Sequence, residues 1–128
     1  MPDQTENCVF CNIISGKNPA QIEYQDTAII AFTDIEPAAP FHLLVVPKKH
    51  IGSIDQVQST DQEILGKLVI TAKEIAHRSN LDEEGYRIVI NNGHNGGQKV
   101  EHLHLHLLAG TELGPMTSAK PNPISQFG

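Results

Sequence analysis

Three histidines stand at alternate positions near the C-terminal end of the chain. His102, His104 and His106 are separated by single leucines. Because successive side chains of a β-strand point to opposite faces, a strand here would place the three imidazoles on one side and the leucines on the other. A strand with an idle polar face would more often carry threonine, lysine or glutamate. The alternation therefore predicts a site that uses imidazole chemistry.

Imidazoles at this spacing support two kinds of chemistry. They could bind a metal ion that activates water at an open coordination position. Alternatively, a neutral imidazole could attack phosphorus while its neighbours bind phosphate oxygens and transfer protons. The spacing alone leaves both hypotheses open.

A glycine-rich segment, residues 91–98, directly precedes these histidines. Gly93, Gly96 and Gly97 can adopt backbone conformations closed to other residues, so several N–H groups could converge on an anion. Gln98 and Lys99 could add side-chain donors. The same composition is also typical of a simple hairpin turn. The sequence leaves the turn and the phosphate cradle open.

The elements that must position these residues follow one another through short connections. A short helix over 8–15 ends at Gly16, which suits a left-handed cap. A long helix over 61–79 begins with a possible capping box between Thr60 and Glu63. Its apolar stripe comprises Ile64, Leu65, Leu68, Val69, Ala72, Ile75 and Ala76. Strands are expected at 22–24, 28–33, 42–46, 86–90 and 102–108. This order indicates an α+β domain with an antiparallel sheet.

Composition limits the classes of partner. The 128 residues suit one domain, and the net charge is −6, from 15 acidic and 9 basic residues. With no basic stripe, the chain is a poor candidate for binding a nucleic-acid backbone. No apolar run is long enough to span a membrane, and residues 1–7 do not resemble a signal peptide. We expect a cytoplasmic protein without nucleic-acid or membrane partners.

Several motifs, in order along the chain, resemble one family. His102 to Leu108 reads H-φ-H-φ-H-φ-φ, where φ is apolar, which is the signature of the histidine-triad (HIT) nucleotide-binding proteins. The segments 10–16, 31–37, 39–51 and 91–98 are similar to the Hint branch of that family. The resemblance covers about residues 8–110 in one register, and it leaves 111–128 as an extended tail of a single HIT domain over 1–128. It implies a five-stranded antiparallel sheet, and a homodimer that joins two sheets.

The resemblance also assigns roles to individual residues. It makes His104 the nucleophile of a nucleotidyl-histidine intermediate, with His106 and His42 at the phosphate and His102 completing the triad. His104 must then be neutral at its attacking nitrogen, so we expect a backbone carbonyl to accept its other N–H. Asn91, Gln98 and Lys99 fall on the phosphate side, and Asp34 falls where the ribose hydroxyls bind. Near the base it places Val9, Phe10, Ile13, Ile35 and Leu44. The implied reaction is hydrolysis of the P–N bond of a purine nucleoside phosphoramidate, of the AMP-amine or AMP-lysine type, with AMP as one product.

Cys8 and Cys11 form a C-x-x-C pair with three interpretations. A redox pair would need a thioredoxin-like strand and helix around it, and that context is missing. Two buried thiols could simply fill space. Some histidine-triad relatives bind structural zinc with such a pair and two histidines, which here would be His50 and His102. No organic cofactor is implied.

Two departures from the Hint pattern concern substrate choice. Lys99 stands where a small hydroxyl residue is common, and the tail after Gly110 lacks the Gly-Gly-Arg and tryptophan of many Hint proteins. The leaving group is therefore open. Alternatives within the same family are a dinucleoside polyphosphate hydrolase or a nucleotidyl transferase. A non-catalytic module that binds nucleotide or zinc is a further alternative.

Overall fold

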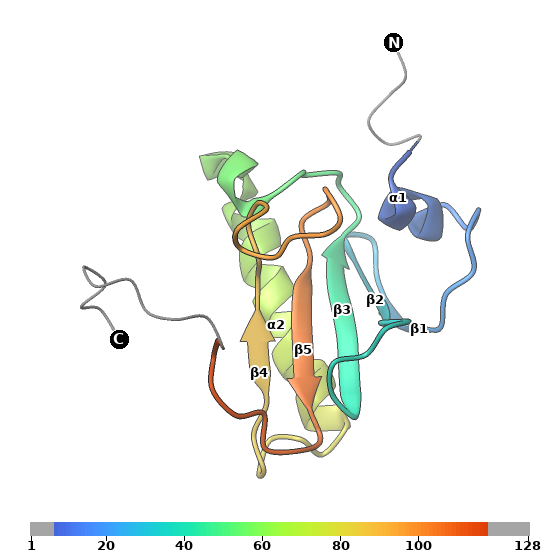
Figure 1. The fold of residues 1–128 in the computed structure, drawn as a ribbon. Helices are drawn as coiled ribbons and strands as arrows, with labels where there is room; N and C mark the ends of the chain where they lie inside the picture. The colour runs from blue at the N-terminus through green and yellow to red at the C-terminus, as the bar shows by residue number, and fades with distance from the viewer. Residues whose placement is uncertain (1–6, 118–128) are drawn as a thin grey trace, which may run out of the picture.

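A five-stranded antiparallel sheet forms the centre of the computed structural model, which describes residues 7–117 (Figure 1). Its spatial order is β1-β2-β3-β5-β4. The strands are β1 (Ile22–Gln25), β2 (Ile29–Thr33), β3 (Phe41–Pro47), β4 (Arg87–Val89) and β5 (Leu105–Ala109). The helices are α1 (Val9–Ile14) and α2 (Gln62–Arg78), and short 3-10 turns span Ile54–Gln56 and Ser59–Asp61. The expected α+β fold, with a long and a short helix, is confirmed.

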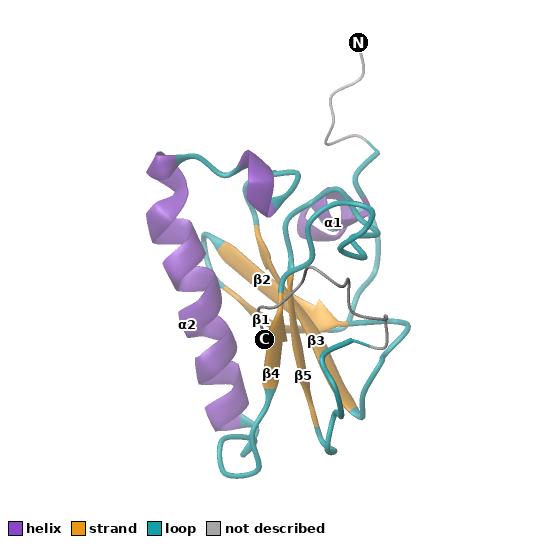
Figure 2. Ribbon diagram, turned by 60° about the vertical axis from the view of Figure 1, so that its left-hand side comes forward, coloured by secondary structure: helices purple, strands orange, loops and turns teal. Residues whose placement is uncertain are grey.

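The sheet is covered on both faces, by α2 on one and by α1 with neighbouring loops on the other (Figure 2). In β2, Ile29 and Ala31 pack in the core that α2 covers, whereas Ile30 and Phe32 pack with Phe10 of α1. In β3, the same alternation divides Leu43 and Val45 from Leu44 and Val46. Because side chains alternate between two buried faces, the central strands are apolar at nearly every position.

The start of α2 differs from the prediction. The capping box lies between Gln58 and Asp61, not between Thr60 and Glu63. The Gln58 backbone N–H donates to Asp61 Oδ2 at 2.9 Å, and the Lys49 ammonium lies 2.7 Å from Asp61 Oδ1. A lysine distant in sequence thus helps to hold the carboxylate that closes the turn before α2. Val69, expected in the apolar stripe, is instead 45% exposed.

The last strand is shorter than predicted. β5 begins at Leu105, so His102 and His104 lie in the segment that precedes it. The register pairs Val45 with Leu105, and the next residues of β3 lead to Pro47, which has no N–H to donate. The Pro47 carbonyl is bonded instead to Nε2 of His102, at 2.8 Å. The ladder therefore stops before it reaches the first two histidines.

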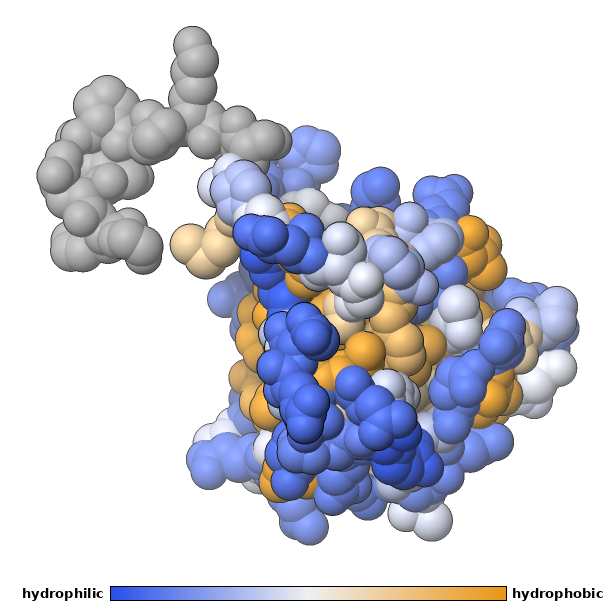
Figure 3. Space-filling view, turned by 90° about the horizontal axis from the view of Figure 1, so that it is seen from below, coloured by the Kyte–Doolittle hydropathy of each residue, from blue (hydrophilic) through white to orange (hydrophobic). Residues whose placement is uncertain are grey.

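The remaining described surface bears on the other predictions. Residues 111–117 contain no helix or strand, and Arg87 of β4 holds them through a 2.6 Å bond to the Gly114 carbonyl. The rest of the expected tail, 118–128, and the N-terminal residues 1–6 lie outside the described residues. Hydrophilic residues surround a central apolar area on the end of the molecule drawn in Figure 3. Within 7–117, no helix combines the length and apolarity needed to cross a bilayer.

Candidate active site

A cavity of about 540 Å³ lies on the α1 side of the sheet. This size is typical of pockets that bind small ligands. The residues predicted near a nucleotide that line it are Val9, Phe10, Ile13, Asp34, Ile35, Leu44, Asn91 and Lys99. Three histidines, His42, His104 and His106, also line it and are called the cavity histidines below. The structure therefore brings most of the predicted site into one place.

The strands position two of the cavity histidines. In the register of β3 and β5, Leu44 pairs with His106 and His42 pairs with Leu108. His42 and His106 are thus diagonal neighbours on one face, close enough for long side chains to meet. His42 Nε2 lies 2.9 Å from His106 Nδ1.

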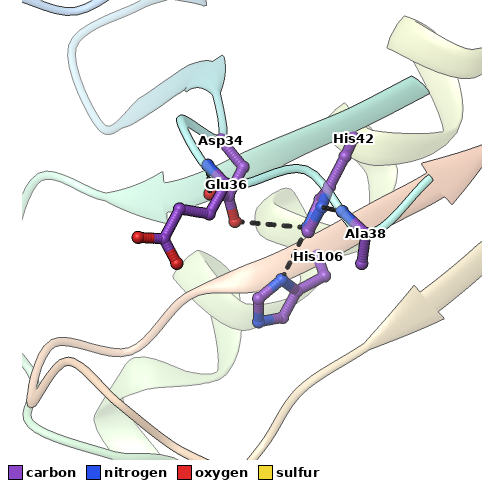
Figure 4. A network of polar contacts seen from close by, with 5 residues as sticks. All are labelled: Asp34, Glu36, Ala38, His42 and His106. Atoms are coloured by element: carbon purple, nitrogen blue, oxygen red, sulfur yellow. Dashed lines mark hydrogen bonds and ion pairs between the residues drawn. The ribbon is translucent and has the colours of Figure 1, made fainter. Parts of the chain in front are cut away.

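A backbone amide determines where the protons of this pair lie (Figure 4). The Ala38 N–H donates to His42 Nδ1 at 2.9 Å, so the proton of neutral His42 must be on Nε2. That N–H donates to His106 Nδ1, which places the proton of His106 on Nε2. Asp34 Oδ2 is a second acceptor, 3.4 Å from His42 Nε2. The chain of bonds leaves His106 as a donor.

His104 has the opposite arrangement. Its Nδ1 lies 2.7 Å from the backbone carbonyl of His102, and a carbonyl can only accept. Nδ1 therefore carries the proton, and Nε2 keeps a lone pair. The ring is 6% exposed and packs edge-on against Phe10, with centroids 5.1 Å apart. These contacts fix a neutral, oriented imidazole at the cavity, as a nucleophile requires.

Burial keeps the cavity histidines neutral. It lowers the pKa of His104, against the opposing effects of the His102 carbonyl and Asp34. For His106, burial and the neighbouring His104 and His42 lower the pKa to about 4. The pKa of His42 is also lowered by burial, and Asp34 opposes that shift. Near pH 7 the lone pair of His104 is therefore available.

The glycine-rich segment is a closed turn. The N–H of Gly97 donates to the His94 carbonyl, and that of Gln98 to the Gly93 carbonyl, both at 3.0 Å. The Gly93 N–H donates to the Gln98 side chain at 2.9 Å. These three amides are used within the turn, so of the two hypotheses the structure favours the turn over the phosphate cradle.

Within the part of the chain that the structure describes, the residues that line the cavity do not include Gln98. Its amide donates to the carbonyls of Gly52 and Val100 at 2.8 and 2.9 Å, which braces the turn. Asn91 lines the cavity and donates to the Gly96 carbonyl at 2.6 Å. Asp34 accepts the Glu36 N–H at 2.8 Å, and the Glu36 carboxylate points away from His42 and His106 (Figure 4).

His102 lies in a second group, the thiol–imidazole cluster, formed by Cys8, Cys11, His50 and His102. His102 Nδ1 lies 3.3 Å from Cys8 Sγ and 3.5 Å from Cys11 Sγ, and 3.1 Å from His50 Nδ1. Cys11 Sγ lies 3.3 Å from His50 Nδ1. The structure thus separates His102 from the cavity histidines. Its link to His104 is its backbone carbonyl.

The donor set and geometry of this cluster fit a tetrahedral metal ion. Ligand atoms about 2.0–2.3 Å from a zinc ion would lie roughly 3.3–3.8 Å apart, close to the separations found. Donation from Nε2 of His102 to Pro47 leaves Nδ1 as a ligand atom. Burial lowers the pKa of His102 to about 4, so the ring is neutral, as a ligand must be. The cluster can hold a metal.

Sequence reasoning missed the backbone groups that orient His42 and His102, although it expected a backbone carbonyl to hold His104. The Ala38 N–H orients the ring of His42 and the Pro47 carbonyl orients that of His102. Neither contact can be inferred from the type of a side chain. The turn-forming segment 37–40 was the available signal for the first. The loop residues Asn18, Pro19 and Ala20 also line the cavity and carried no signal.

Comparison with known proteins identifies the family. The HIT domain model matches residues 15–113. The chain is 40% identical over 115 residues to purine nucleoside phosphoramidase from Escherichia coli (strain K12), covering 90% of this chain and 97% of the relative. A HIT family hydrolase structure from Legionella pneumophila superimposes with a TM-score of 0.83 at 48% identity, covering 84% and 96% of the two chains. A histidine triad protein from Clostridium difficile gives 0.84 at 38%, covering 91% and 100%. This chain therefore belongs to the HIT domain family.

Proposed function

We propose that this protein hydrolyses the P–N bond of purine nucleoside phosphoramidates through a nucleotidyl intermediate on His104. The observation that carries the proposal is the bond from His104 Nδ1 to the His102 carbonyl, which leaves Nε2 unprotonated at the cavity. The E. coli relative is named for this activity, and solved relatives from Legionella pneumophila and Clostridium thermocellum are HIT family hydrolases, which supports the reaction class.

The first step forms a bond between His104 Nε2 and phosphorus while the P–N bond breaks. The bound phosphate anion raises the pKa of His106, so this ring takes up a proton from water. It donates that proton from Nε2 to the departing nitrogen. While His106 is protonated, Asp34 Oδ2 is the acceptor for the N–H of His42, from which it lies 3.4 Å.

The second step releases AMP. A water molecule attacks phosphorus, and the bond to His104 Nε2 breaks. Nε2 of His106, which has lost its proton, accepts a proton from that water. His104 recovers its lone pair, and the products are AMP and an amine. When AMP leaves, the pKa of His106 falls again and the ring returns its proton to the solvent.

The Asp34 end of the cavity is proposed to hold the ribose, and the apolar wall the base. A carboxylate can accept hydrogen bonds from both ribose hydroxyls. Phe10 and Leu44 are buried, and Ile35 is 93% exposed at the rim. Asn91 and Lys99 are proposed to face the phosphate, and Gln98 to act by bracing the turn beside it.

The direct test is a substrate panel with purified protein. Adenosine 5′-monophosphoramidate should yield AMP and ammonia, faster than dinucleoside polyphosphates are cleaved. The polyphosphate alternative is favoured by the presence of Lys99 in the cavity lining, since an ammonium could bind a further phosphate. Faster polyphosphate cleavage would select that alternative. AMP binding with no turnover of any substrate would select a non-catalytic module.

We also propose structural zinc in the thiol–imidazole cluster. With four protein ligands, the ion would have no position for water and would act as a crosslink. Elemental analysis should find one zinc ion per chain. A homodimer is proposed through the edge strand β4 and α2, where Ile88, Val69 and Ile70 are 36%, 45% and 54% exposed. Light scattering would test it. A cytoplasmic location, the absence of nucleic-acid or membrane partners and a single domain over 1–128 stay predictions.

A further inference from the structure

We propose that the thiol–imidazole cluster controls nucleotide affinity, because the metal it binds would hold one wall of the nucleotide cavity in place. The inference rests on the proposed nucleotide site and on the proposed zinc ion, whose absence by elemental analysis would overturn it. Its structural basis is that helix α1 belongs to the cluster and to the cavity at once.

Helix α1 presents two sets of side chains. Cys8 is its N-cap residue and Cys11 lies within it, and both belong to the cluster. Val9, Phe10 and Ile13 of the same helix line the cavity. A helix of six residues is not stable by itself, so its position depends on what it packs against.

The other two ligands are anchored beside the central strands. His102 is fully buried and is held by its bond to the carbonyl of Pro47, the last residue of β3. The Leu103 N–H donates to the Ile51 carbonyl at 2.6 Å, which joins the segments that carry His102 and His50. A metal in the cluster would therefore connect α1 to the sheet through four strong bonds. Without it, α1 is held to the sheet by the apolar packing of Phe10 and by polar contacts of 3.3–3.5 Å to sulfur, which is a weak hydrogen-bonding atom.

A second connection runs from the cluster to the nucleophile. The ring of Phe10 lies edge-on to both His102 and His104, with centroids 5.9 and 5.1 Å away. The His102 carbonyl accepts the N–H of His104. A shift of α1 would thus remove part of the apolar wall and loosen the packing of His104. The face of the sheet packed by α2 would be unaffected, because its core shares no residue with this wall.

Thermodynamic linkage makes the effect reciprocal. If the metal tightens nucleotide binding by some factor, the nucleotide must tighten metal binding by the same factor. A factor clearly above one is what separates a coupled wall from a metal that only stabilises the fold, and agreement between the two directions checks that both affinities are measured correctly.

The experiment measures both affinities on the full chain. Calorimetry gives the Kd of AMP for zinc-loaded and chelator-treated protein, and competition with a fluorescent chelator gives the zinc Kd with and without saturating AMP. We expect zinc removal to weaken AMP binding at least about fivefold, the lower end of typical coupling between sites, and AMP to tighten zinc by the same factor. Hydrogen exchange should show loss of protection in residues 8–14 while β3 and β5 stay protected. Equal AMP affinity in the loaded and metal-free proteins would overturn the proposal.

Control variants distinguish a loss of the cavity wall from a general loss of stability. Leu68→Ala removes a buried side chain on the α2 face, so it should lower thermal stability and leave both affinities within twofold. If chelation unfolds the chain, the double variant Cys8→Ala, Cys11→Ala replaces the thiols by small apolar groups and serves as the metal-free form. Unfolding of both forms would mean that the metal supports the whole fold, which overturns the proposal. Failure of the zinc-loaded protein to bind AMP would instead overturn the nucleotide site itself.

Discussion

The thiol–imidazole cluster and the cavity histidines lie side by side, yet they present imidazole in opposite ways. His102 ties Nε2 to the Pro47 carbonyl and turns Nδ1 toward the thiols. His104 ties Nδ1 to the His102 carbonyl, which leaves Nε2 at the cavity. Both rings are nearly inaccessible to solvent, at 0% and 6% exposure, and burial lowers the pKa of both. The comparison teaches that the ring nitrogen bonded to the backbone decides whether a histidine can bind metal or attack phosphorus.

Replacing His104 should abolish the chemistry of the cavity and leave the thiol–imidazole cluster unchanged. We expect His104→Ala to lower kcat by about 10⁴-fold or more, because the covalent route loses its nucleophile. Zinc content and AMP affinity should stay near those of the wild type. His77→Ala is the matched control, since this imidazole lies exposed on α2 with its side chain 55% accessible. Unimpaired turnover by His104→Ala would rule out the proposed mechanism.

Replacing His106 tests the proton donor beside the nucleophile. His106→Asn should lower kcat by roughly 10²–10⁴, the usual contribution of general acid–base catalysis, and change AMP affinity far less. Steady-state kinetics separate the two effects. The loss should be smaller for a substrate with a better leaving group, which needs less protonation. A rise in KM at constant kcat would show that His106 only binds substrate.

The buried His106 should make the stability of the protein depend on pH. Burial, with smaller contributions from His104 and His42 and against the effect of Asp34, lowers the folded pKa of His106 to about 4, below the unfolded value of 6.5. Between pH 4 and pH 6.5 the unfolded chain binds more protons at His106 than the folded chain does. The contribution of neutral His106 to the free energy of unfolding is therefore present above pH 6.5 and is lost as the pH falls toward 4. Urea unfolding at pH 7 and pH 5 should show lower stability at pH 5. The decrease should be smaller for His106→Asn. An imidazole NMR titration of His106 centred near 6.5 would contradict the expectation.

The smallest expected effect concerns Lys99. Among residues 7–117, Lys99 is the one lysine or arginine that lines the cavity, and its side chain lies on the surface. Exposed ion pairs contribute at most about 1 kcal/mol, so Lys99→Gln should raise KM by no more than about fivefold. High salt should reduce the difference from the wild type. The exposed Lys73→Gln on α2 is the matched control, and an equal effect of both substitutions would remove Lys99 from the site.

Much of this architecture could be predicted from local patterns. Short apolar runs bounded by turn residues and prolines indicated the central strands, and helical spacing indicated α2. The errors came from contacts between distant segments. His102 and His104 were predicted in a strand, but the paired strand ends at Pro47. The capping box was misplaced because Lys49 and Gln58 hold Asp61.

For the site, the side chains could be predicted, and so could a backbone carbonyl that holds the second N–H of His104. The groups that orient the other histidines could not. The histidine spacing and the family resemblance identified residues that line the cavity. The tautomers of His42 and His102 depend on the Ala38 amide and the Pro47 carbonyl, which leave no mark on residue types. Gln98 was expected on the phosphate side. Its side-chain amide instead donates to two backbone carbonyls, so direct contact with phosphate stays a prediction.

Trapping the intermediate tests most directly whether His104 is the nucleophile. Zinc-loaded enzyme is mixed with adenosine 5′-monophosphoramidate and quenched within the first turnover by a denaturant at alkaline pH. The protein is then digested, and the peptide that contains residues 102–106 is fragmented by mass spectrometry. We predict an adenylyl group on His104, formed and lost at rates that match turnover, and absent from His104→Ala. Turnover without any adduct, or an adduct on His106 or His102, would contradict the assignment.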